Sequence, residues 1–294
     1  MKSEYLERVN HIATDNISSA QQILRDTLDL LFDFSSDNSG TPNFTAELKS
    51  LLTTMCNAQS QMSALSNICK LVISTSDGLK QDKVGPYLDD LRKKVGEASS
   101  KAASEASKFI SGGKCYATLS QSEFVIKSFE QAATEKKFAT IYVMESRPLF
   151  EGRQTVRALM KMGHRPILVS DASIGFFISE IDSAFVGADS ILSDGTIINK
   201  IGSYPLAACC AANKKNFYVV TSVLKYDPER AVDNFVNKEE SAHEIFANPE
   251  FEVENFYFDK VNPEFITAII TEVGSILPLS GFNKLNSAIS EIYS

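Results

Sequence analysis

The run Phe217-Tyr218-Val219-Val220-Thr221 is one of six short apolar segments, rich in Val, Ile, Tyr and Phe, in the second part of the chain. Segments this apolar are typical of strands covered on both faces, as in a parallel sheet between layers of helices. Stretches of helical length and spacing, such as 122–134 and 152–162, separate them. Repeated strand–helix units predict a doubly wound, Rossmann-like α/β sheet with right-handed crossovers. The other five segments are Cys115–Leu119, Ala139–Met144, Ile167–Ser170, Ala184–Val186 and Phe265–Ile270.

The first 110 residues have a different periodicity. Apolar residues recur every three or four positions along three stretches, 6–31, 48–72 and 87–109, which is the spacing of long amphipathic helices. A polar loop at 35–43 separates the first two stretches, and a break at 75–78 precedes the third. We therefore predict an N-terminal helical bundle over residues 1–110, followed by the Rossmann-like α/β domain over residues 111–294.

Composition excludes several classes of function. The chain has 294 residues with 29 Lys and Arg against 37 Asp and Glu, a net charge of −8, which disfavours direct binding of nucleic acid. No apolar run reaches the ~18 residues of a membrane span, so we expect a cytoplasmic protein that does not contact a membrane. Five cysteines without repeated spacing and three histidines predict no metal site, and we expect reduced thiols.

Candidate functional residues follow the predicted strands, because ligands of open α/β sheets bind where the carboxyl ends of the strands meet. One Arg and one Lys in these positions suit a phosphate group, and hydroxyl, amide and carboxyl groups suit the rest of a small molecule. The residues themselves predict a site for a phosphorylated small molecule. We expect its ligand-binding residues to be Ser120, Arg147, Asp189, Asn199 and Lys200.

A helix that begins near Ser203 would add backbone N–H donors and a positive dipole end to this site. The glycines, however, form neither a GxGxxG nor a GxxxxGK[ST] motif, so no nucleotide cofactor is expected from the pattern. The segment from Asp227 to Glu254, which is rich in charged residues, is predicted to be a long surface loop.

Ordered motifs in the second part of the chain resemble those of one known family. They include Glu145-Ser146-Arg147-Pro148, Val186-Gly187-Ala188-Asp189 and Ile198-Asn199-Lys200-Ile201-Gly202. Over roughly residues 110–294 the chain resembles the initiation factor 2B superfamily, whereas the N-terminal helices agree only in architecture. That superfamily joins the regulatory α, β and δ subunits of a guanine-nucleotide exchange factor to methylthioribose-1-phosphate and ribose-1,5-bisphosphate isomerases. Further matching segments are Phe217–Val220, Asn255–Asp259 and Ile269–Gly274.

The resemblance implies a specific question about catalysis. The isomerases of the family use a cysteine and an aspartate, and the aspartate matches Asp189. The family cysteine corresponds to Ser120 in Thr118-Leu119-Ser120, and an alkyl hydroxyl is a far weaker acid than a thiol, which titrates near ~8.5. Cys115 lies five residues earlier, at the expected beginning of its strand. Arg147 matches the loop that contacts phosphate in the family, while Asn199 and Lys200 would contact ligand hydroxyls or phosphate.

Three interpretations stay open. The first is a non-catalytic α-type regulatory subunit or homologue, which forms a homodimer, binds initiation factor 2 or other 2B subunits, and keeps a sugar-phosphate or nucleotide pocket. The second is an aldose–ketose isomerase of a 1-phosphorylated sugar, in which Asp189 would be catalytic. The third is a homodimer that senses metabolites without contacting the translation apparatus. The missing cysteine favours the first.

Overall fold

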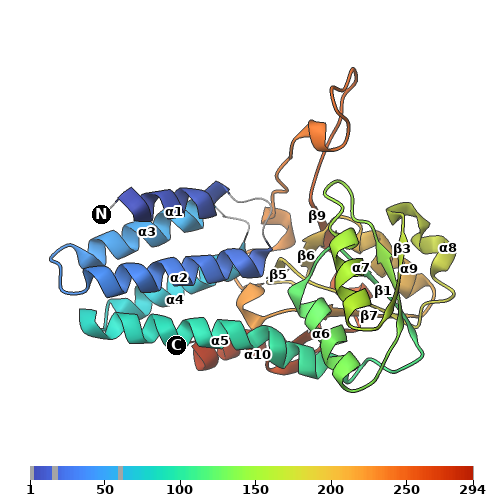
Figure 1. Cartoon of the computed structure of the whole chain (residues 1–294), viewed down its shortest axis with the longest axis horizontal. Coiled ribbons are helices and arrows are strands. Elements are labelled where there is room, and N and C mark those ends of the chain that lie inside the picture. The colour runs from blue at the N-terminus through green and yellow to red at the C-terminus, as the bar shows by residue number, and fades with distance from the viewer. Residues whose placement is uncertain (1–2, 15–18, 59–61, 294) are drawn as a thin grey trace.

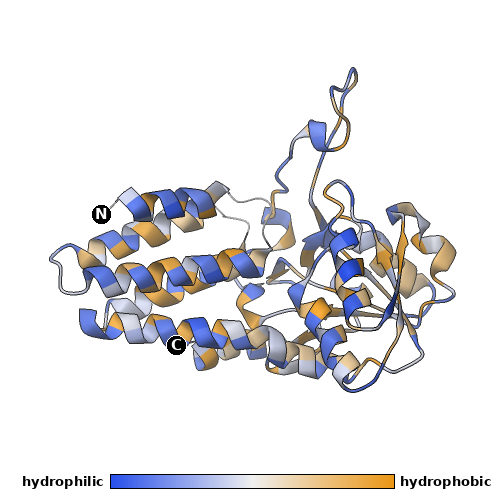
Figure 2. Ribbon diagram, in the orientation of Figure 1, coloured by the Kyte–Doolittle hydropathy of each residue, from blue (hydrophilic) through white to orange (hydrophobic). Residues whose placement is uncertain are grey.

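The computed structural model describes residues 3–14, 19–58 and 62–293. Five helices form its N-terminal part, and α5 continues along the sheet of the second part (Figure 1). Figure 2 shows hydrophilic and hydrophobic residues along each of these helices, as expected for amphipathic helices that bury one face. Their bounds are α1 (Ser3–Thr14), α2 (Ala20–Asn38), α3 (Phe44–Ala58), α4 (Ser63–Ser76) and α5 (Gln81–Ser107).

The expectation of three N-terminal helices is wrong, because the first two predicted stretches each form two helices. Ser19 has an extended backbone, with φ −64° and ψ 151°, and its hydroxyl accepts a hydrogen bond from the Gln22 amide at the start of α2. This is the geometry of a helix N-cap. The apolar spacing continues across the junction, so periodicity alone cannot reveal it. Ile17, which we assigned to the long helix, lies outside the described residues.

Six parallel strands confirm the predicted doubly wound sheet. The sheet order is β11-β10-β7-β4-β1-β2-β3, and only β11 (Gly274–Ile276) is antiparallel to its neighbour. Numbered by their order in the chain, the six parallel strands run 3-2-1-4-5-6, which is the Rossmann order. Their bounds are β1 (Cys115–Leu119), β2 (Thr140–Met144), β3 (Arg165–Val169), β4 (Ser183–Val186), β7 (Asn216–Val220) and β10 (Ala268–Thr271).

Alternate residues of the central strands enter two separate hydrophobic clusters. Ile141 and Val143 of β2 pack in the cluster shared with α5 and α6, while Tyr142 and Met144 belong to the cluster on the other face. This alternation follows from the two-residue repeat of a strand. The edge strand β3 is less buried than the central strands, since its Leu168 side chain is 44% exposed. The covering helices are α6 (Glu123–Thr134), α7 (Gly152–Lys161), α8 (Ile174–Phe177), α9 (Ser203–Ala212) and α10 (Phe282–Tyr293).

A second, four-stranded sheet was not predicted. Its order is β8-β5-β6-β9, and its strands have only two to four residues, too few for a recognisable alternation. Asn199 and Lys200 lie within one of these strands rather than in a loop after a strand. The bounds are β5 (Ser190–Leu192), β6 (Ile197–Lys200), β8 (Tyr226–Asp227) and β9 (Phe258–Val261).

The segment predicted as a long surface loop is mostly irregular and includes two short 3₁₀ turns, at 232–234 and 242–244. Residues 236–256, here called the projecting arm, extend away from the rest of the molecule (Figure 1). The bridge between Glu239 and Phe256 closes the base of this arm. Within the described residues, no helix is both long and apolar enough to span a membrane.

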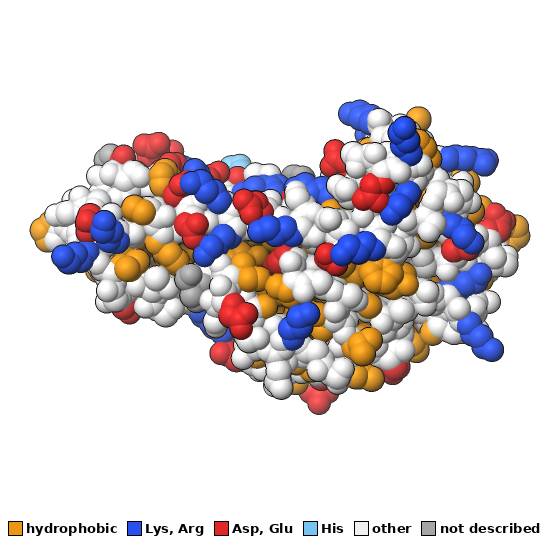
Figure 3. All heavy atoms as spheres, turned by 90° about the horizontal axis from the view of Figure 1, so that it is seen from below, with side chains coloured by type: hydrophobic (Ala, Val, Ile, Leu, Met, Phe, Trp, Pro, Cys, Tyr) orange, Lys and Arg blue, Asp and Glu red, His pale blue; other side chains and the backbone are white. Residues whose placement is uncertain are grey.

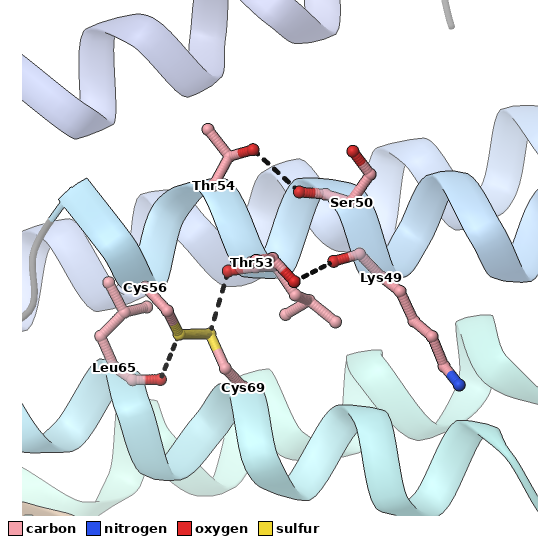
Figure 4. The surroundings of a disulfide bond; sticks show 8 residues. Lys49, Ser50, Thr53, Thr54, Cys56, Leu65 and Cys69 are labelled. Atoms are coloured by element: carbon pink, nitrogen blue, oxygen red, sulfur yellow. Dashed lines mark hydrogen bonds between the residues drawn. A yellow bond between two sulfur atoms is a disulfide. The ribbon is translucent and has the colours of Figure 1, made fainter.

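One cysteine pair departs from the expectation of reduced thiols. Cys56 of α3 and Cys69 of α4 form a disulfide that joins these two neighbouring helices (Figure 4). Their separation of 13 residues does not correspond to any motif, which is why the pair could not be recognised from spacing. Cys115, Cys209 and Cys210 are free.

Truncation of Phe185 tests the burial of the central sheet. This side chain of β4 is fully buried and packs against the rings of Tyr116, Phe129 and Tyr218. We expect Phe185→Ala to lower the free energy of unfolding by about 3–5 kcal/mol, measured in urea, because it removes a ring from a closed core. Phe176→Ala is the control: this ring is 79% exposed, and its loss should change stability by less than about 0.5 kcal/mol. Equal losses in the two variants would contradict the assignment.

Candidate functional site

A pocket of about 610 Å³ opens at the carboxyl ends of β1 and β4. In the doubly wound order this is the topological switch point, where the chain connections leave the sheet in opposite directions and a crevice forms. The pocket also has a wall from the N-terminal helices. Its main contributing segments are Ser19–Gln21 before and in α2, Leu119–Phe124 between β1 and α6, Gly187–Asp189 after β4, and Asn199-Lys200 of β6.

The structure brings four of the five predicted site residues into this pocket: Ser120, Asp189, Asn199 and Lys200. They come from two sheets, since Ser120 and Asp189 follow strands of the large sheet and the other two lie in β6 of the small sheet. The Asn199 amide donates a hydrogen bond to the Ser203 hydroxyl, at 2.7 Å, so part of its side chain also fixes the start of α9.

Arg147 does not line this pocket. Its guanidinium donates a hydrogen bond to the Ile245 carbonyl of the projecting arm, at 2.8 Å, and lies over the Phe150 ring at 4.8 Å. Its backbone amide donates to the carboxylate of Asp171, which also accepts a bond from the Ser146 amide. The structure therefore places Arg147 where it holds the arm and the loop after β2.

The backbone of Ser120 is fixed in a left-handed conformation with φ +59°. Its amide donates to the Ser146 hydroxyl at 2.6 Å, and its carbonyl accepts a hydrogen bond from the Thr155 hydroxyl at 2.6 Å. These contacts set the direction in which the Ser120 side chain leaves the loop.

A carboxyl and an ammonium group lie together in the pocket. Asp189 lines the pocket and is partly exposed. Burial raises the pKa of its carboxyl, whereas the positive charges of Lys225 and Lys200 act to lower it. Lys225 is buried and donates a hydrogen bond to the Ala188 carbonyl, and burial lowers the pKa of its ammonium group. A pKa shifted by burial is a common feature of groups that donate or accept protons.

Lys225 is held in place from two directions. The Asn67 side chain of α4 donates to the carbonyls on either side of it, those of Leu224 at 2.8 Å and Tyr226 at 2.7 Å. On the other side, the Glu272 carboxylate accepts bonds from the Ser222 hydroxyl at 2.6 Å and from the Tyr293 hydroxyl at 2.7 Å. The N-terminal helices and the last helix thus both position the short turn that carries Lys225.

Lys200 already has an anionic partner. Its ammonium group lies 2.8 Å from Glu151 Oε1 and 4.7 Å from the centre of the Tyr257 ring. The lysine is only 6% exposed, so this ion pair is shielded from bulk water. The second carboxylate oxygen of Glu151 is buried and has no hydrogen-bond partner among the described residues.

The start of α9 at Ser203 confirms the predicted position of that helix, but its donors are engaged. The Asp259 carboxylate accepts hydrogen bonds from the backbone amides of Gly202 at 2.7 Å and Tyr204 at 2.9 Å. A carboxylate at this place satisfies the free N–H groups and the positive end of the helix dipole. The expectation that this helix end would bind a phosphate is therefore wrong for the structure as described.

Sequence reasoning missed Glu151 and Tyr257, and it did not name Lys225 among the ligand-binding residues. Glu151 lies in the turn before α7, where nothing in its local pattern distinguishes it from a helix-initiating acid. Tyr257 follows the projecting arm and reaches the pocket only because β9 pairs with β6. Across the described part of the chain, no cysteine lines the pocket and no group of three or more His, Cys, Asp or Glu could hold a metal.

The fold and the pocket define a class: a doubly wound α/β protein with an N-terminal helical part and a polar pocket at the switch point. The chain belongs to the initiation factor 2 subunit family, whose family profile matches residues 16–278. It is 27% identical over 283 residues to a ribose 1,5-bisphosphate isomerase of Archaeoglobus fulgidus, covering 94% of this chain and 90% of the relative.

Two further relatives carry translation-factor names. A putative translation initiation factor eIF-2B subunit 2-like protein of Pyrococcus horikoshii is 30% identical over 217 residues, covering 74% of this chain and 76% of the relative. The crystal structure of a Pyrococcus horikoshii translation initiation factor eIF-2B superimposes with a TM-score of 0.85 at 23% identity, covering 95% of this chain and 98% of the other. Relatives of both kinds therefore share the fold.

The carboxylate of Glu272, which accepts a hydrogen bond from Ser222 in the turn that carries Lys225, leads to a pH prediction. Burial raises the pKa of the Glu272 carboxyl in the folded protein. As the pH rises, this carboxyl therefore ionises in the unfolded chain before it ionises in the folded protein. The free energy of unfolding falls over that range, until the pH passes the pKa of the folded state. We expect Glu272→Gln to lack this loss: its stability relative to the wild type should rise between about pH 4 and 7. Urea unfolding at several pH values measures it. A constant difference between the two proteins would contradict a raised pKa, and exposed Glu250→Gln is the control.

Proposed function

We propose that this chain is a non-catalytic homologue of the initiation factor 2B regulatory subunits that keeps a pocket for a sugar phosphate or a nucleotide. One observation carries the proposal: the position of the family's catalytic thiol holds Ser120, and among the described residues no cysteine lines the pocket. A serine hydroxyl ionises too weakly near neutral pH to exchange a proton with a sugar carbon or ring oxygen at a useful rate.

The pocket supports binding of a small polar ligand. Its lining combines two ammonium groups, several amides and hydroxyls, and the carboxyl of Asp189, which together can orient a phosphorylated polyol. The acidic surface does not prevent this, because the field inside a pocket is set by the groups that line it. In Figure 3 basic and acidic side chains are interspersed over the face that is shown.

The partners in this proposal follow from the family. We infer a homodimer that associates with initiation factor 2 or with other 2B subunits in the cytoplasm. The relative from Pyrococcus horikoshii with a translation-factor name supports this role, and so does the coverage of nearly the whole fold by the matching crystal structure.

A sugar-phosphate isomerase is the second candidate, and Asp189 favours it. Its raised pKa and its place in the same pocket as Ser120 suit an acid–base residue. The relative named as a ribose 1,5-bisphosphate isomerase covers almost the whole chain.

A turnover assay separates the two candidates. The purified protein is incubated with ribose 1,5-bisphosphate or methylthioribose 1-phosphate, and the ketose product is followed by NMR. We expect no product from the wild type, because the thiol is absent. Ser120→Cys is the matched variant, since it restores the family thiol in the same loop and would show whether the offered sugar fits. Wild-type turnover that Asp189→Asn abolishes would overturn the regulatory interpretation.

A second measurement addresses the partners. We expect the purified chain to retain initiation factor 2 or another 2B subunit on an affinity column. Absence of both turnover and retention would favour the homodimer that only senses metabolites.

A further inference from the structure

The charges around the pocket are unequal. Two lysines, Lys200 and Lys225, are the basic residues of its described lining, against four carboxylates. Two of these carboxylates already have side-chain partners. Glu123 lies 2.8 Å from Arg25 and 3.1 Å from Lys127, and Glu244 accepts bonds from the hydroxyl of Tyr257 and the amide of Asn255. The remaining carboxylates are Glu151 and Asp189.

Glu151 holds a lysine at ion-pair distance: the ammonium group of Lys200 lies 2.8 Å from its Oε1. A phosphate ester carries a charge of about −1.5 to −2 at pH 7, so a second phosphate adds as much again. A phosphate beside Lys200 would have to displace Glu151 or lie against its carboxylate in a poorly hydrated site, and both are costly.

The free oxygen of Glu151 points to a different kind of ligand group. Glu151 Oε2 is buried and has no partner among the described residues. Buried acceptors are almost always satisfied, and a ligand hydroxyl is a neutral donor that can do so without adding charge. The remaining N–H groups of Lys200 are donors and the free Oε2 of Glu151 is an acceptor, which together suit a sugar hydroxyl, because a hydroxyl both accepts and donates whereas an ionised phosphate only accepts.

We propose that Glu151 determines the ligand class: by pairing with Lys200 it makes that end of the pocket a hydroxyl site, so the ligand carries no phosphate there and a monophosphate is preferred to a bisphosphate. The inference rests on the proposed binding of a phosphorylated sugar and adds the number of phosphates and the residue that sets it. Glu151 is a specificity-determining residue in this proposal, whether or not the bound sugar reacts.

Calorimetric titration with ribose 5-phosphate, ribose 1,5-bisphosphate and ribose tests the proposal. We expect the wild type to bind the monophosphate at least about tenfold more tightly than the bisphosphate, and ribose most weakly. Glu151→Gln keeps the shape and frees the charge of Lys200, so it should shift the ratio of the two dissociation constants at least about tenfold toward the bisphosphate. Glu264→Gln removes one exposed negative charge outside the pocket lining and should leave the ratio unchanged.

The double variant Glu151→Gln with Lys200→Met keeps the test valid if the single change destabilises the fold by leaving a buried charge unpaired. In it the gain for the bisphosphate should disappear, and thermal unfolding of each variant shows that it is folded. Tighter wild-type binding of the bisphosphate, no binding of the monophosphate, or an unchanged ratio in Glu151→Gln would overturn the inference. Product formation in the NMR assay would instead overturn only the non-catalytic role, because the ratio is measured separately.

Discussion

A buried ammonium group must be surrounded by oxygen atoms, and the need to satisfy Lys225 connects three distant parts of the chain. Its partner is the Ala188 carbonyl just after β4, at the switch point of the sheet. The turn that carries it is fixed by Asn67 from the N-terminal helices and, through Glu272, by Tyr293 of the last helix. Loss of any of these contacts would leave a charge or a polar group buried without a partner, which is far costlier than loss of an exposed contact.

The N-terminal helices also contact the segments that form the pocket. Arg25 of α2 forms an ion pair with Glu123 at the start of α6, and Ser63 of α4 shares a 2.7 Å hydrogen bond with Ser190 of β5. One hydrophobic cluster also runs from α1 into the sheet. The boundary near residue 110 describes a change in periodicity and stays a prediction as a domain boundary, while the pocket draws residues from both sides of it.

The parts of the structure that could be predicted are those with a strong periodic signal. All six apolar segments form parallel strands, because a strand buried on both faces must be apolar over its whole length. The second sheet escaped, since strands of two to four residues show no alternation. Ser120 and Asp189 were found because they follow strands, whereas Asn199 and Lys200 lie within one, and Glu151 and Tyr257 are brought in only by tertiary contacts. Arg147 fits the family motif, yet a carbonyl of the projecting arm engages its guanidinium.

The charges inside the pocket and the serine at the thiol position both bear on whether the pocket is suited to catalysis. An isomerase pocket must stabilise charge that develops during the reaction, and preorganised cations serve this purpose best when they are not already neutralised. Here Lys200 is neutralised by Glu151, so its charge is not free to be aimed at a developing oxyanion. Neutralised lysines still bind and orient a ligand, because a paired ammonium group keeps N–H donors for hydroxyl oxygens. The serine at the thiol position and the pairing of Lys200 with Glu151 both support the proposal that the pocket recognises a sugar without converting it.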